Sequence, residues 1–89
     1  MIERTFKIQN TRGVHLRPST MLAEAMEKYN CRVTIWHHGN DFQGKSTLHL
    51  FSAMIRQGDE ITVVCKGADE NEAMTEAPAI IDGGFGEFL

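Results

Sequence analysis

A histidine, an arginine and a proline follow a glycine within residues 13–18, in the order Gly13, His15, Arg17 and Pro18. The imidazole of His15 can act as a nucleophile, and the planar guanidinium of Arg17 can contact two phosphate oxygens at once. Pro18 is tolerated in the first turn of a helix, and Gly13 can adopt the positive φ of a tight turn. This pattern predicts an exposed helix start that carries chemistry on His15.

A phosphoryl group on His15 would find several partners at a helix start. The first N–H groups of a helix lack partners within it, and they lie at the positive end of its dipole. Anions bind readily there. The alternative is that His15 merely caps the helix and that Arg17 is a solvated surface residue, which is the usual situation for a lone histidine. The combination of all four residue types favours the phosphate-binding interpretation.

Apolar periodicity predicts the elements that position this segment. Their order, βαββαβα, with one packed and one wet face on each strand, predicts an α/β (α+β) open-faced sandwich. It would be a four-stranded antiparallel sheet with three helices on one face, folded as a single domain over residues 1–89. The predicted strands are 2–8, 31–36, 41–43 and 61–66, and the predicted helices are 16–29, 47–55 and about 69–81.

Composition excludes several function classes. The net charge of −3 argues against nucleic-acid binding, and no apolar run is long enough to insert into a membrane. Two cysteines, Cys31 and Cys65, are too few and too far apart for a zinc site or a disulfide framework. We therefore expect a cytoplasmic monomer whose cysteines are inert thiols in the core.

The residues of this helix start resemble the active-site signature of the HPr family, the histidine-containing phosphocarriers of the bacterial phosphotransferase system. The family pattern is G-[LIVM]-H-x-R-P. The resemblance extends over nearly the whole chain, through a preceding asparagine, the segment before the second helix and the C-terminal tail. The matching residues are Gly13, Val14, His15, Arg17 and Pro18, then Asn10, Gly44, Lys45 and Ser46, then Gly84, Phe85, Gly86 and Glu87.

The resemblance implies a carrier rather than an enzyme. Phosphorylated enzyme I would transfer its phosphoryl group to Nδ1 of His15, and the carrier would pass it to an EIIA domain. Leu16 would support the helix start together with Gly13 and Pro18. No metal and no small-molecule cofactor is implied. Whether the branch served is sugar uptake or nitrogen-type regulation stays open, as does the identity of the EIIA partner.

Ser46 precedes the second predicted helix and is a plausible N-cap. The resemblance implies a further role, because the family serine at this place is phosphorylated in many bacteria by HPr kinase/phosphorylase. A bare cap needs no such role, and both interpretations stay open.

Partner docking needs an exposed surface near His15. If the first two helices pack side by side, the candidate contacts are Leu16, Arg17, Thr20, Thr47, Leu48 and Phe51. We expect Leu16 and one or two residues of the second helix to be exposed, although Leu48 or Phe51 taken singly is more often a core residue. Thr47 stands where the family usually has an apolar contact residue.

Two alternatives compete with the carrier. Residues 39–46 fit G-x-x-x-x-G-K-[ST], the phosphate-binding P-loop, but too little chain follows for the parallel sheet that such a domain needs. A pure interaction module would leave His15 unphosphorylated.

Three further expectations concern single residues. His37 and His38 are adjacent, so on a strand they would point to opposite faces, as surface residues unable to share a metal. His49 should be solvated. Pro78 falls inside the last predicted helix, which it should kink or break.

Overall fold

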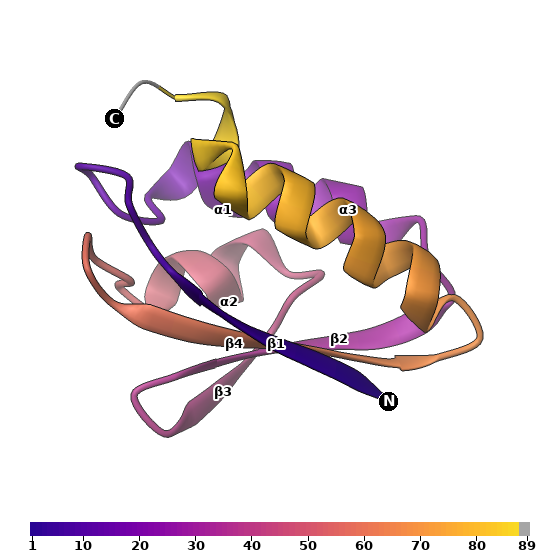
Figure 1. The fold of residues 1–89 in the computed structure, drawn as a ribbon. Helices are drawn as coiled ribbons and strands as arrows, with labels where there is room; N and C mark the ends of the chain where they lie inside the picture. Colours follow the sequence, from indigo (N-terminus) through magenta and orange to yellow (C-terminus); the bar gives the residue numbers. More distant parts are fainter. Residues whose placement is uncertain (88–89) are drawn as a thin grey trace.

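Four strands form one antiparallel sheet, and three helices cover one of its faces (Figure 1). The computed structural model describes residues 1–87. The predicted open-faced sandwich is therefore confirmed. Its elements are β1 Ile2–Lys7, α1 Leu16–Glu27, β2 Cys31–His37, β3 Asn40–Gln43, α2 Thr47–Ser52, β4 Glu60–Gly67, α3 Glu70–Asp82 and the 3₁₀ turn Gly84–Gly86.

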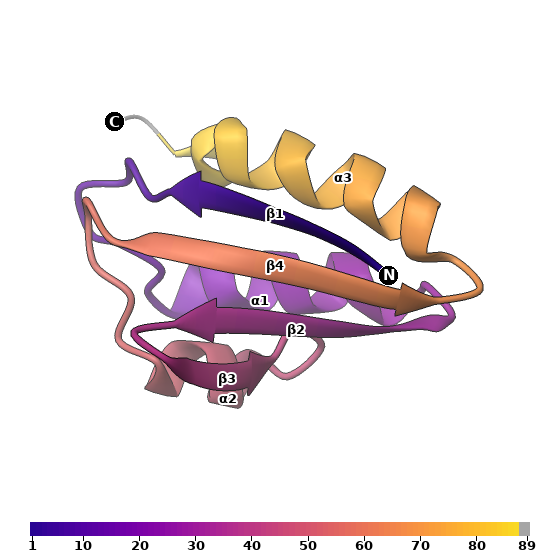
Figure 2. The same cartoon turned by 60° about the horizontal axis from the view of Figure 1, so that its bottom comes forward.

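The strands lie in the order β1-β4-β2-β3, so the last strand in sequence is central (Figure 2). Within β4, Val63 lies opposite Arg4 of β1 on one side and Ile35 of β2 on the other. The short β3 pairs only with the second half of β2, from Thr34 to His37. This order brings the beginning of the chain beside its later half.

The core lies between the sheet and the helices, where the strand alternation predicted it. Burying an aliphatic side chain stabilises a fold by roughly 1.5–3 kcal/mol, so this face holds the layers together. The buried face of α1 is centred on Leu22, Ala23 and Met26, whereas Met21 and Ala25 are only partly buried. Five residues at alternating positions of β2 and β4 are all buried on this face, namely Val33, Ile35, Ile61, Val63 and Cys65.

The last two helices differ from their predicted form. Helix α2 ends at Ser52, before Met54 adopts a left-handed φ of +54°, although Ile55 is buried beyond it. Helix α3 runs past Pro78 to Asp82, so the expected break is wrong. Proline removes only one N–H donor, and burial of Ala77, Pro78 and Ile81 holds the helix on both sides of that position.

The two cysteines are free and lie on neighbouring strands. Cys65 is buried opposite Val33, and Cys31 is half-buried two positions along β2. Burial, with the adjacent Cys31, raises the pKa of the Cys65 thiol to about 11. Because the thiolate is the reactive form, Cys65 is inert at neutral pH. Among the helices of residues 1–87, none has the length and apolar character needed to cross a bilayer.

Candidate functional site

A tight turn positions the start of α1. Gly13 adopts a φ of +64°, and its N–H donates to the carbonyl of Asn10 at 2.9 Å. The next N–H, from Val14, donates to the carbonyl of Ile55 at 3.0 Å. A Cβ atom at Gly13 would lie 2.2 Å from that same carbonyl oxygen. Only glycine fits here, and the turn holds His15 at the N-terminus of α1.

His15 is the N-cap residue of α1, but its ring does not cap the helix. The backbone carbonyl of His15 accepts hydrogen bonds from the N–H and hydroxyl of Ser19, at 3.0 and 2.9 Å. The imidazole instead places Nε2 2.7 Å from Oε2 of Glu87, and 22% of its side chain is exposed. The ring is therefore reachable from solvent and oriented by a carboxylate.

Asn10 fixes that carboxylate from behind. Its buried side-chain amide donates to Oε1 of Glu87 at 2.8 Å and to the carbonyl of Gly84 at 2.7 Å. These bonds tie the C-terminal tail to the turn before α1. The Asn10 hydrogen bond, followed by the hydrogen bond and charge of His15 and the charge of Arg17, lowers the pKa of Glu87. Glu87 is thus ionised at neutral pH.

The role of Glu87 was missed by the sequence reasoning. In the sequence the tail stands out only through the family resemblance, and no periodic or local pattern links residues 72 positions apart. The one available signal was an acidic residue in a glycine-rich stretch near the end of the chain. The same resemblance includes Asn10 but implies no role for it.

The predicted residues of the first helical turn lie where the motif placed them. Arg17 is exposed, and its charge lies close enough to Glu87 to favour the ionised carboxylate. Pro18 is buried in the first turn, while Leu16 is exposed as expected. Thr20 is half-buried, and its hydroxyl donates to the carbonyl of Leu16 at 3.0 Å.

Helix α2 presents most of its apolar residues to solvent. Leu48 is 74% exposed and Phe51 is 46% exposed, which confirms the expectation that one or two residues of the second helix are exposed, and neither of them is a core residue. A helix of six residues turns less than twice, and here only Leu50 is buried. Thr47 is half-buried at the first position of the helix.

Ser46 is the N-cap of α2, as predicted. Its hydroxyl oxygen accepts a hydrogen bond from the N–H of His49 at 3.2 Å. The side chain is half-buried, so part of it faces solvent.

A hollow of about 570 Å³ lies between the start of α1 and the C-terminal end of α2. The ring of His15 borders it together with Val14, Phe51 and Met54. Its wall is mostly apolar, and Arg12 and Arg56 also line it. The structure therefore brings the exposed ring and part of α2 onto one surface.

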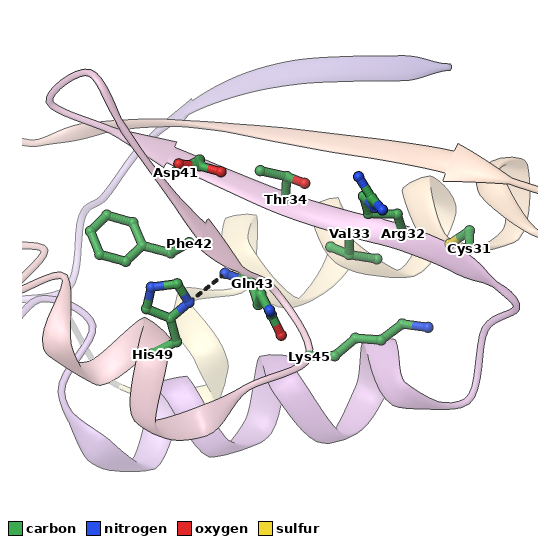
Figure 3. A pocket seen from close by; sticks show the side chains of 9 residues that line it. All are labelled: Cys31, Arg32, Val33, Thr34, Asp41, Phe42, Gln43, Lys45 and His49. Carbon is green, nitrogen blue, oxygen red and sulfur yellow. Dashed lines mark hydrogen bonds between the residues drawn. The ribbon is translucent and has the colours of Figure 1, made fainter.

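A second hollow, of about 890 Å³, lies between β2, β3 and α2 (Figure 3). Lys45 and Arg32 border it, and Nδ1 of His49 accepts the N–H of Gln43 there at 3.0 Å. It contains none of the predicted phosphoryl-site residues. Residues 39–46 supply β3 and the turns around it in an antiparallel sheet, which confirms that they are no P-loop.

The prediction for His37 and His38 is wrong in two respects. His37 is buried, and its ring stacks on that of His38 with centroids 3.9 Å apart. The reason is a left-handed φ of +50° at His38, which ends the strand alternation at His37. The two rings therefore lie on one side of the hairpin.

Comparison with known proteins agrees with this geometry. A model of the HPr component phosphorylation site of the phosphotransferase system matches residues 2–82. The multiphosphoryl transfer protein of Haemophilus influenzae is 30% identical over 97% of the chain, and the chain spans only 18% of that protein's length.

Solved structures give the same result. HPr-C-His from Thermoanaerobacter tengcongensis has a TM-score of 0.94 and 28% identity, with 100% of both chains covered. The histidine-containing phosphocarrier protein of Mycoplasma has a TM-score of 0.88 and 26% identity, covering 93% of this chain and 96% of the other. An HPr dimer from Thermoanaerobacter tengcongensis has a TM-score of 0.77, 28% identity and coverages of 98% and 100%. The chain belongs to the HPr family of phosphotransferase-system phosphocarriers.

Proposed function

We propose that this chain accepts a phosphoryl group from phosphorylated enzyme I on His15 and delivers it to an EIIA domain. The observation that carries the proposal is the half-exposed imidazole at the start of α1, hydrogen-bonded through Nε2 to Glu87. Membership in the HPr family supports it independently.

The contact with Glu87 selects the nucleophilic nitrogen. A neutral imidazole carries one N–H, and an ionised carboxylate can only accept a hydrogen bond. Nε2 therefore carries the proton, which it donates to Oε2 of Glu87 at 2.7 Å. Nδ1 is left with a free lone pair, and we assign it as the phosphoryl acceptor. Asn10 contributes by holding the carboxylate in place.

The transfer step follows from this arrangement. The Nδ1 lone pair attacks phosphorus, a P–N bond forms, and the bond from phosphorus to the donor breaks with its electron pair returning to the donor. The ring gains positive charge as it reacts, because Nε2 keeps its proton. Glu87 stabilises that charge, as a carboxylate behind a catalytic histidine does.

The transferred group would then meet a prepared anion site. Helix geometry leaves the N–H groups of Leu16 and Arg17 without partners within α1. The Arg17 guanidinium is exposed and can reach phosphate oxygens in a two-pronged contact. Because the site is shallow, the phosphoryl group is supported yet stays accessible to the next acceptor.

The docking surface in this proposal surrounds the ring. Exposed apolar side chains and the hollow beside His15 provide the apolar area that a transient partner needs. We propose that enzyme I and EIIA domains use this one surface in turn, contacting a monomeric carrier in the cytoplasm. The proposed contact residues are Leu16, Arg17, Thr20, Thr47, Leu48 and Phe51.

We also propose that Ser46 is a regulatory phosphorylation site for an HPr kinase/phosphorylase. Its hydroxyl lies at the start of α2, next to the docking surface. A dianion there would repel acidic partner surfaces while the carrier's own fold tolerates it. Treatment with the kinase should label the chain, and Ser46→Ala should abolish that label.

Incubation with phosphoenolpyruvate and enzyme I tests the main proposal. We expect one acid-labile, base-stable phosphoryl group per chain, mapped to His15 and absent from His15→Ala. Transfer to EIIA should follow on mixing. Absence of label, or label on another residue, would instead favour an interaction module.

A further inference from the structure

We propose that His37, His38 and Asp59 form a binding site for a divalent transition-metal ion, with Zn²⁺ as the representative case. One ligand atom from each of the three side chains lies within 4.8 Å of the other two. Two imidazoles and a carboxylate are ligand types that Zn²⁺ takes in proteins. None of the three residues takes part in the phosphoryl transfer proposed above.

The hairpin between β2 and β3 brings the two histidines together. His38 has a φ of +50° and Gly39 a φ of +80°, the pair of left-handed residues found in type I′ turns. Asparagine or glycine normally precedes the glycine in such turns, and other residues there cost energy. The chain keeps a histidine at this strained position, where its ring faces the same carboxylate as His37.

Asp59 is anchored so that it faces both rings. Its Oδ2 accepts the N–H of Arg56 at 2.9 Å, and its backbone carbonyl accepts the N–H of Ile8 at 2.8 Å. The carboxylate lies 2.8 Å from Nε2 of His37 and 3.8 Å from Nε2 of His38.

A metal ion fits after a small movement of the exposed histidine. Zn²⁺ binds nitrogen and oxygen at about 2.0–2.1 Å in a tetrahedron, which places ligand atoms roughly 3.3 Å apart. His37 is only 5% exposed and Asp59 is anchored, so these two provide the fixed part. The side chain of His38 is 68% exposed, and its ring can leave the stack to turn its lone pair toward the ion. The ion replaces the proton on Nε2 of His37, which passes to water.

The space beside the three ligands has room for the ion, but one neighbouring positive charge disfavours its binding. A hollow of about 320 Å³ is bordered by the three ligands and by Ala53, Met54 and Arg56. Three protein ligands leave a coordination position for water. The guanidinium of Arg56 repels a cation, so the site binds less tightly than one without it. Met54 and Arg56 also border the hollow beside His15, so the two sites adjoin.

Calorimetric titration of the full chain with Zn²⁺ in a buffer free of chelators and phosphate tests the proposal. We expect one ion per chain. His38→Asn removes the imidazole but supplies the residue that a type I′ turn prefers, so it should fold as well as the wild type. Its affinity should fall by at least about tenfold, the usual minimum even for loss of an outer-shell partner. Asp59→Asn should weaken binding similarly.

Two controls make the outcome decisive. His15→Ala should bind Zn²⁺ as the wild type does, because its ring is not a ligand. Urea unfolding with a chelator present checks that His38→Asn is folded. Zn²⁺ should also shift the ring-proton NMR signals of His37 and His38 in the wild type. Equal affinity of wild type and His38→Asn, or loss of binding in His15→Ala, would overturn the proposal.

Discussion

Two histidine–carboxylate pairs of nearly equal length lie in different settings within residues 1–87. His15 lies 2.7 Å from Glu87, and His37 lies 2.8 Å from Asp59. The first ring is 22% exposed, at a helix start, while the second is 5% exposed, at the end of a strand. The same hydrogen bond thus occurs once on a partly exposed ring and once on a ring that is almost fully buried.

The carboxylates are also held in different ways. Glu87 is fixed by the side chain of Asn10, 77 residues away, whereas Asp59 is fixed by the backbone N–H of Arg56 three residues earlier. A contact between distant segments depends on the whole fold, and a local loop contact does not. We infer that the first pair serves chemistry and that the second joins β2 to the loop before β4.

The largest expected effect is the loss of all phosphoryl acceptance in His15→Ala. The ring is partly exposed and makes no capping bond, so the free energy of unfolding should change by less than about 1 kcal/mol. Phosphorylation by enzyme I and phosphoenolpyruvate, with urea unfolding in parallel, measures both quantities. A folded His15→Ala chain that is still phosphorylated would show that the His15–Glu87 pair is not the phosphoryl site.

The reverse pattern is expected for His37→Ala. This substitution leaves a cavity and removes a charge-assisted hydrogen bond, which together should lower the free energy of unfolding by about 2–3 kcal/mol. Phosphorylation of His15 should continue while the chain is folded. Urea unfolding checks the stability, and a His37→Ala chain as stable as the wild type would show that this pair is not structural.

A smaller effect is expected for Glu87→Gln. The amide keeps the shape of the carboxylate but can no longer stabilise positive charge on the ring, so phosphorylation of His15 should slow by about tenfold. The initial rate with enzyme I in excess measures this. Glu27→Gln, an exposed change on the same helix as His15, is the control. Equal rates for the two variants would show that the Glu87 carboxylate only holds the C-terminal tail in place and does not assist phosphorylation.

The smallest effect concerns acid stability. The folded pKa values of Glu87 and Asp59 are both lowered, so each carboxylate adds stability that is complete above its ordinary pKa, 4.5 or 3.8. That stability is lost as the pH falls from there through the folded value. Urea unfolding between about pH 6 and pH 3 should show that the free energy of unfolding declines, beginning near the ordinary glutamate pKa. The decline should be shallower in Glu87→Gln and in Asp59→Asn. If the free energy of unfolding of both variants fell with pH in parallel with that of the wild type, this expectation would be contradicted.

Much of the fold followed from local patterns in the sequence. Alternation in residues 61–66 predicted strand β4, though not its central place in the sheet, because one face of that strand meets the helices and the other meets water. The position of His15 at a helix start was also predictable, since Gly13 and Pro18 act within one turn. Its role as phosphoryl acceptor stays a prediction.

Non-local features escaped the sequence reasoning. Nothing in the spacing links Glu87 to His15, because the chain order does not say where a tail folds back. The alternation rule failed at His38, since it assumes extended backbone and a single left-handed residue reverses the side-chain direction. The general rule that apolar residues are buried does not hold for Leu48 and Phe51, because a short helix cannot bury every apolar residue it contains.

The hydrogen bond between Glu87 and His15 has a consequence for larger proteins that contain a domain of this fold. Glu87 lies beside the ring of His15, which we propose as the phosphoryl acceptor, whereas Met1 lies near Glu70, at the opposite end of the sheet (Figure 1). Attachment on the downstream side would hold a donor or acceptor at an effective concentration that is roughly millimolar for a short flexible linker. The order in which such modules are fused would thereby decide which of them exchange phosphate within one polypeptide.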